Sequence, residues 1–104
     1  MTSVVPSVEL RDRTLIVRGV VDAQSVVPLR QQGEALIRLA QARLDVDLAQ
    51  LETAHSVVLS MLLCWQRVAG QSGSSLCFRH ISDRLESLAA LSNLDERLPG
   101  FEPV

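Results

Sequence analysis

The sequence predicts one α/β domain in which helices pack on a small mixed, mostly parallel sheet. Segments of alternating apolar residues, typical of strands, take turns along the chain with amphipathic segments of helical periodicity. The apolar residues are almost all aliphatic, since Trp65, Phe78 and Phe101 are the only aromatic residues. A chain of 104 residues has the length of a single domain. The predicted order of elements is β-β-α-β-α-β-α.

The first two predicted strands are residues 8–10 and 14–21, joined by a polar turn, which indicates a hairpin at one edge of the sheet. Ser25 is the predicted N-cap of the first helix, with Pro28 in its first turn. Apolar and polar residues of this helix segregate to opposite faces. The apolar positions are Leu29, Gly33, Leu36, Ala40 and Leu44, and the polar ones are Arg30, Gln32, Glu34, Arg38 and Gln41.

The next strand is predicted over residues 44–48, where leucine and valine alternate with Asp45 and Asp47 on a solvated side. A second helix is predicted from Ser56 to about Gly70, followed by an exit loop over residues 71–74. Residues 76–78 form a short buried strand. Because helices connect these strands, we expect them to be parallel.

The third predicted helix begins at Asp83, which resembles the first residue of a capping box that Glu86 completes. Its apolar residues are Leu85, Leu88, Ala89 and Leu91. Asn93 is the predicted left-handed stop, and residues 94–104 are expected to be a turn and a frayed tail.

Composition and charge exclude several classes of protein. The formal net charge is −2 and the ten basic residues are all arginines scattered along the chain, which argues against a nucleic-acid-binding module. The N-terminus lacks the features of a signal peptide, and the longest apolar stretch, residues 57–65, is far short of the ~20 residues of a membrane span. We therefore expect a cytoplasmic protein. Cys64 and Cys77 have no metal or redox spacing and are expected to be buried, reduced thiols.

No catalytic constellation is apparent in the sequence. The two histidines, His55 and His80, accompany no glycine-rich phosphate loop, and Gly70 and Gly73 indicate a turn. Asp45 and Asp47 share one side of a strand, but no histidine or cysteine lies beside them to complete a metal site. We expect no enzyme activity, no cofactor and no metal.

The helix from Ser56 is almost free of charge, and its only polar side chains between Val57 and Ala69 are Ser60, Gln66 and Arg67. A surface helix of a small domain usually turns a charged face to water. An uncharged helix is either buried on every side or covered by a partner, and we favour the partner. Its inward stripe would be Val58, Leu62, Trp65 and Ala69, and its exposed edge Leu59, Ser60, Leu63 and Arg67.

Ser56 has two interpretations. Its hydroxyl can cap the helix by accepting the backbone N–H of Val58 or Leu59, which local chemistry favours. It can also be a contact or phosphorylation residue, because a dianion is stabilised at a helix N-terminus. The two roles are compatible.

Two segments together resemble a known family. They are Leu44-Asp45-Val46-Asp47-Leu48 and, after a short loop, His55-Ser56-Val57-Val58-Leu59 opening an apolar helix. This arrangement resembles the STAS-domain family, and in particular the MlaB-type subunits of bacterial phospholipid ABC transporters. The glycines that follow the helix and the leucines of residues 85–94 are also similar. The resemblance spans about residues 8–98 and implies a single STAS domain over residues 1–104.

The resemblance implies a non-catalytic subunit that binds an ABC-transporter ATPase (MlaF-like) and, through it, the permease complex that maintains outer-membrane lipid asymmetry. Such a protein would lie at the inner membrane through its partner, without a membrane span of its own. Asp22, after the second strand, and Ser56 correspond to the family's binding face. With the helix edge described above, the predicted partner-binding residues are Asp22, His55, Ser56, Val57, Leu59, Ser60, Leu63 and Arg67.

The chain departs from the family pattern beside Ser56. His55 replaces an aspartate that forms part of the family's phosphorylation site, and Val57 and Val58 replace small residues. Both changes favour a permanent hydrophobic dock over a phosphorylation switch. The alternative is an anti-sigma-factor antagonist that acts by protein–protein partner switching and is phosphorylated at Ser56.

Overall fold

The computed structural model describes residues 6–52, 55–92 and 98, and its elements follow the predicted order. The strands are β1 (Ser7–Arg11), β2 (Thr14–Gly19), β3 (Arg43–Leu51) and β4 (Ser75–Arg79). The helices are α1 (Val26–Ala40), α2 (Ser56–Ser72) and α3 (Asp83–Leu91). The α/β class and the order β-β-α-β-α-β-α are therefore confirmed.

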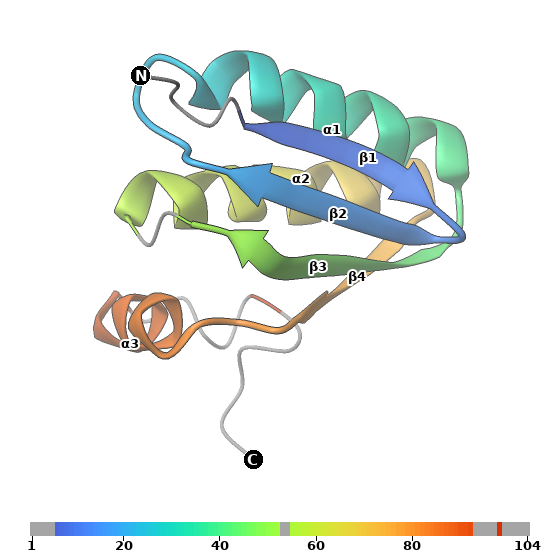
Figure 1. Ribbon diagram of the computed structural model, residues 1–104. Coiled ribbons are helices and arrows are strands. Elements are labelled where there is room, and N and C mark those ends of the chain that lie inside the picture. Colours follow the sequence, from blue (N-terminus) through green and yellow to red (C-terminus); the bar gives the residue numbers. More distant parts are fainter. Residues whose placement is uncertain (1–5, 53–54, 93–97, 99–104) are drawn as a thin grey trace.

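The four strands form one sheet in the order β1-β2-β3-β4. β1 and β2 are antiparallel, and the turn between them contains Asp12 and Arg13, both at positive φ. β2 and β3, and then β3 and β4, pair in parallel because a helix connects each pair. Figure 1 shows α1 and α2 side by side on one face of the sheet, with α3 set apart from them. α1 packs against β1 and α2, and α2 also contacts β4 and α3.

The core lies between the sheet and the α1–α2 layer. Alternation along β2, β3 and β4 turns one set of apolar side chains toward the helices, as the sequence predicts for residues 44–48. The predicted inward stripe of α2 is confirmed, because Val58, Leu62, Trp65 and Ala69 are all buried. The other face of the sheet is polar, and Asp45 and Asp47 lie on it with partial exposure.

Gly33 allows α1 to approach α2 closely. A Cβ atom built on Gly33 would lie 2.3 Å from the Cε2 and Cζ2 atoms of Trp65. The same indole donates a hydrogen bond from Nε1 to the carbonyl oxygen of Arg30, 3.0 Å away. The buried tryptophan therefore occupies the space that a side chain at position 33 would need.

α3 begins at Asp83 as predicted, but its predicted cap and the predicted end of α2 are wrong. Ser82, not Asp83, caps α3, because its backbone is extended and its hydroxyl accepts the N–H of Leu85 at 3.2 Å. Asp83 and Glu86 lie in the first turn of α3 instead. α2 continues two residues past Gly70, to Ser72, and Gly73 ends it in the left-handed conformation with φ 78°.

Several predicted exposures are also wrong. Glu34, assigned to a polar face, is 7% exposed, because its carboxylate pairs with Arg30 at 2.7 Å and approaches Arg38 at 3.8 Å. Cys64 and Cys77 are free thiols, as predicted, but are half-buried rather than buried.

No helix within the described part of the chain is long and apolar enough to cross a membrane.

The end of the chain lies largely outside the described residues. The predicted stop at Asn93 cannot be compared with the structure for this reason, nor can the predicted tail of residues 94–104 apart from Leu98. The side chain of Leu98 is fully buried in the core. The prediction of a turn and a frayed tail over residues 94–104 did not identify this position as part of the core.

Candidate functional site

The N-termini of α1 and α2 lie at one end of the molecule, at the left of Figure 1, where β2 and β3 end. The N–H of Glu52 donates to the carbonyl oxygen of Gly19 at 2.9 Å and joins the ends of these two parallel strands. The loops that follow them carry Asp22 and His55. The fold therefore brings Asp22 to the same end as His55, Ser56 and Val57, although it is distant from them in sequence.

Asp22 organises the loop that leads into α1. Its Oδ1 accepts hydrogen bonds from the backbone N–H groups of Gln24 at 3.0 Å and Ser25 at 2.8 Å. The Ser25 hydroxyl donates to the same carboxylate and accepts the N–H of Asp22, each at 3.0 Å. These bonds, chiefly that from the backbone of Ser25, lower the pKa of the Asp22 carboxyl. Ser25 therefore occupies the N-cap position, but its hydroxyl binds the loop and not the helix.

Ser56 is not the N-cap of α2, which corrects the prediction. His55 occupies that position with an extended backbone, φ −119° and ψ 160°, and no side chain caps the helix. The carbonyl oxygen of His55 accepts the N–H of Val58 at 3.0 Å. Ser56 is thus the first helical residue, and both it and His55 are exposed.

A stripe of side chains continues from Ser56 along the outer surface of α2. Ser56, Ser60, Leu63 and Arg67 are spaced by four, three and four residues, which places them on one face of the helix. Three of them are exposed and Leu63 is half-buried. We call these four residues the α2 stripe. Arg67 is the only charged residue of α2.

Leu59 does not belong to this surface. The sequence predicts it at the exposed edge, but its exposed fraction is 1%. The buried arc of α2 is wider than a simple inward stripe because the helix contacts α1, β4 and α3. The buried residues are Val58, Leu59, Met61, Leu62, Trp65, Val68 and Ala69.

Exposed valines at this end were not among the predicted site residues. Val20 follows β2 and is 42% exposed, and Val27 lies in the first turn of α1 and is 47% exposed. Val57, which was predicted, is half-buried in the first turn of α2. The position of Val27 in the first turn of a helix is visible in the sequence, but the exposure of both valines at this end depends on the fold.

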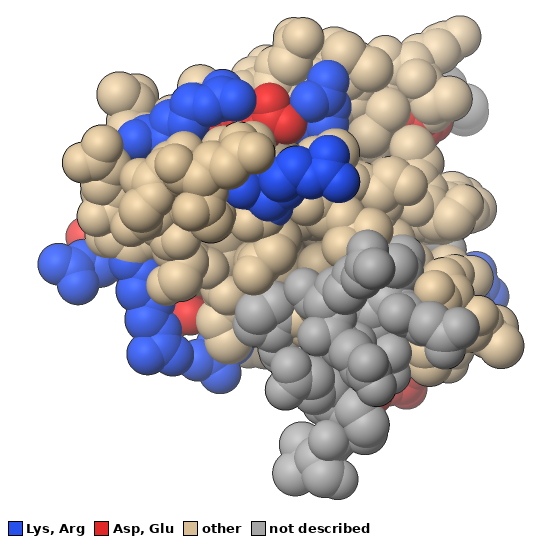
Figure 2. All heavy atoms as spheres, turned by 180° about the vertical axis from the view of Figure 1, so that it is seen from behind, with Lys and Arg blue, Asp and Glu red and all other residues tan. Residues whose placement is uncertain are grey.

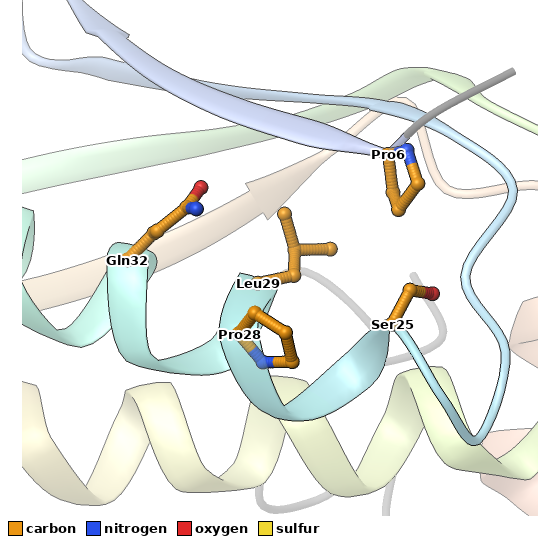
Figure 3. Close-up of a pocket in the computed structure, with 5 residues that line it drawn as sticks. All are labelled: Pro6, Ser25, Pro28, Leu29 and Gln32. Atoms are coloured by element: carbon orange, nitrogen blue, oxygen red, sulfur yellow. The ribbon is translucent and has the colours of Figure 1, made fainter.

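A shallow groove lies where β1 and α1 begin (Figure 3). Its volume is about 170 Å³, and no charged residue is among those that line it. The lining residues are Pro6, Ser25, Pro28, Leu29 and Gln32. The Ser25 hydroxyl is already engaged by Asp22, so the groove offers a ligand little polar chemistry.

Ion pairs of the described residues lie on α1 and on the open face of the sheet. Figure 2 shows the molecule from behind, with basic side chains on both sides of an acidic one at the top. Within α1, ion pairs join Glu34 to Arg30 and Arg38. On the open face of the sheet, Asp45 lies 3.5 Å from Arg79, and Asp47 lies 2.9 Å from Nδ1 of His80.

The paired aspartates of β3 have partners other than a metal. The backbone N–H of Ala49 and, secondarily, His80 lower the pKa of Asp47. Across the described residues, no three histidine, cysteine, aspartate or glutamate side chains gather as metal ligands would. The predicted assignment of Asp45 and Asp47 to a solvated face agrees with their partial exposure.

Comparison with known proteins adds a family and several structural relatives. Residues 7–100 match the model of the protein family described as Mlab, STAS domain. A chain of the Acinetobacter MlaFEDB complex in an ATP-bound conformation is 26% identical, with a TM-score of 0.70 over 84% of this chain and 92% of that chain. No curated protein sequence matches the chain.

Anti-sigma-factor antagonists have the same fold. One from Mycobacterium paratuberculosis is 25% identical, with a TM-score of 0.65 over 93% of this chain and 84% of that chain. The antagonist SpoIIAA in its unphosphorylated form is 18% identical, with a TM-score of 0.68 over 86% of this chain and 81% of that chain. At 18% identity the likeness to SpoIIAA concerns the fold alone.

Proposed function

Because this chain belongs to the STAS-domain family, in the branch described by the MlaB model, we propose that it is a non-catalytic subunit of a phospholipid-transporting ABC complex. In this proposal it binds the cytoplasmic ATPase, an MlaF-like protein, and supports its assembly and activity. It would then lie at the cytoplasmic side of the inner membrane through its partner. The complex would maintain the lipid asymmetry of the outer membrane.

The main structural support for partner binding is the α2 stripe. It is a solvent-facing helix surface with a single charge, at Arg67. The first residues of the helix add the exposed Ser56 and His55 and the half-buried Val57. A mostly uncharged surface with one arginine is suited to a protein interface, since arginine is enriched there and other charges are depleted. The likeness to a chain of the MlaFEDB complex supports an ABC transporter as the source of the partner.

The predicted partner-binding residues do not all have the same role in this proposal. His55, Ser56, Val57, Ser60, Leu63 and Arg67 are accessible and could contact a partner directly. Asp22 acts on the loop through its hydrogen bonds with Ser25 and Gln24. Leu59 is removed from the interface because it is part of the core.

Partner switching by phosphorylation is the second candidate function. Ser56 is exposed and does not cap α2, so the fold does not require its hydroxyl. The 25% identity to the mycobacterial antagonist supports the same function. His55 stands where this switch has an aspartate, and for that reason we place the transporter first.

A pull-down from native membranes with the tagged full-length chain tests the proposal, with mass spectrometry to identify what is captured. We expect an ABC ATPase and its permease. Ser60→Arg should abolish this capture, because a bulky cation in the middle of the stripe cannot be accommodated by an apolar contact. Ala35→Arg, on the exposed surface of α1, is the matched control and should capture the ATPase normally.

Two results would contradict the transporter assignment. Capture of a kinase-like anti-sigma factor, together with phosphate on Ser56 by intact-mass measurement, would establish partner switching instead. Equal capture of the ATPase by the Ser60→Arg and wild-type chains would show that the α2 stripe is not part of the interface. Thermal melting of each variant confirms that it is folded before the comparison is made.

A further inference from the structure

β1 is an edge strand with an unpaired side. It pairs with β2, and no other strand among the described residues pairs with it. The two-residue turn at Asp12 and Arg13 makes Arg11 and Thr14 the closing pair of the hairpin. Hydrogen-bonded pairs alternate in an antiparallel ladder, so the backbone N–H and C=O groups of Val8 and Leu10 point away from β2. These groups can accept another strand.

The surface beside this edge is apolar. α1 contacts β1 and runs in the same direction, because it returns from β2, which is antiparallel to β1. The C-terminal halves of β1 and α1 therefore lie at the same end, as Figure 1 shows. Leu10 is 37% exposed and Leu39 is 83% exposed, with Leu36 half-buried. The flank of α1 turned to this side is formed by Pro28, Gln32, Ala35, Leu36 and Leu39, none of which is charged.

The charged residues of β1 can form pairs of opposite charge with the same residues of a second copy of the strand. If two copies of β1 pair antiparallel about Leu10, Glu9 of each copy lies opposite Arg11 of the other, on the open face of the sheet. Both side chains are accessible, at 38% and 68%, and within one chain they already approach to 3.7 Å. A pairing about Glu9 would instead place the two glutamates opposite each other, which is unfavourable. The charge pattern thus favours the register about Leu10 over the register about Glu9.

We propose that a second copy of this chain binds at the β1 edge, antiparallel about Leu10, so that the two sheets become one continuous sheet. Leu39 of each α1 helix then packs against the second copy beneath the paired strands. A two-fold interface requires one surface to be its own complement, and the order Glu9-Leu10-Arg11 has this property. Binding of a strand from an unrelated protein would not require β1 to be complementary to itself. The interface is on the opposite side of the α1–β1 unit from α2, so it leaves the α2 stripe free.

Sedimentation equilibrium of the full chain over a range of protein concentrations tests the dimer. We expect wild type to reach twice the mass of the chain. Leu39→Glu should raise the dimer dissociation constant by about tenfold or more, because it places a carboxylate in an apolar contact. Leu91→Glu is the matched control, since Leu91 on α3 is 82% exposed, almost the same as Leu39. A monomeric wild type, or equal effects of the two substitutions, would overturn the proposal.

A mixing experiment tests the register. Arg11→Glu alone places like charges opposite Glu9 in a homodimer, and Glu9→Arg alone does so opposite Arg11, so each variant should be monomeric. In a one-to-one mixture, both cross-pairs become glutamate–arginine pairs, and dimers should form again. If the mixture stays monomeric while both variants melt as folded proteins, the proposed pairing is wrong. Neither experiment involves the ATPase, so its outcome is independent of the proposed transporter function.

Discussion

At the scale of single residues, Gly33 determines how closely two helices pack. Alanine is normally a better helix former than glycine by about 1 kcal/mol. At position 33 the added Cβ would instead meet the ring of Trp65, whose indole is fully buried and bonded to Arg30. The steric conflict outweighs the gain in helix propensity because the indole has no room to move without losing its hydrogen bond.

We therefore predict that Gly33→Ala destabilises the protein by about 1–3 kcal/mol, the usual cost of overpacking a core. Gly70→Ala is the control, since Gly70 also lies inside a helix but has nothing within 4 Å of an added Cβ. That variant should be stabilised by up to about 1 kcal/mol. Urea unfolding monitored by circular dichroism measures both. Opposite signs are expected, and equal effects would show that Trp65 moves freely.

At the scale of elements, the helix N-termini differ in how they are capped. Ser82 caps α3 through the N–H of Leu85, whereas the first turn of α2 has no side-chain cap. Ser56 resembles a cap in the sequence because it precedes an apolar run. In the structure the chain has already entered the helix at Ser56, so its hydroxyl is free for a contact outside the domain.

Alanine substitutions distinguish these two serines. Ser82→Ala should lower the free energy of unfolding by about 1 kcal/mol, because the Leu85 N–H loses its acceptor. Ser56→Ala should change it by less than about 0.5 kcal/mol, as expected for surface positions without a specific role. Chemical denaturation measures both variants. A large loss of stability for Ser56→Ala would mean that its hydroxyl supports α2 after all.

At the scale of the whole molecule, carboxylates on two surfaces make stability depend on pH. The pKa of Glu9 is lowered chiefly by its hydrogen bond from Arg18, that of Asp22 by the backbone of Ser25, and that of Asp47 by the backbone of Ala49. Each group has a lower pKa in the folded chain than in the unfolded chain. It therefore stabilises the fold above its unfolded pKa, and this contribution is lost as the pH falls through the folded pKa.

We expect the stability that these groups provide to be constant near neutral pH and to decline below about pH 5, since unfolded carboxyl groups titrate near 4. Urea unfolding at a series of pH values measures the decline. Asp47→Asn should reduce this decline of stability at low pH, because the amide side chain does not titrate in this range. Acid stability that is unchanged by this substitution would show that Asp47 is not one of the groups responsible.

The order of elements, the hairpin at the sheet edge and the inward residues of α2 can all be predicted from the sequence, because each follows from local periodicity. Alternation of period two at residues 44–48 predicts which side chains of β3 face the helices. The helical spacing of Val58, Leu62, Trp65 and Ala69 predicts one buried face in the same way. The family resemblance also depends on contiguous segments, and the family match over residues 7–100 confirmed it.

Whether residues outside those periodic patterns are buried or accessible depends on how the elements pack against one another. Leu59 is buried because α2 has neighbours on more than one side. Glu34 is buried because the guanidinium groups of two arginines neutralise the charge of its carboxylate. Ser56 is left uncapped because the approach of the chain through His55 sets where the helix begins. The burial of Leu59 depends on neighbours that are remote in sequence, and the start of α2 depends on the direction of a loop; a local pattern contains neither. The partners of Glu34 are only four residues away on the same helix, but helical periodicity alone does not show that they cover its carboxylate.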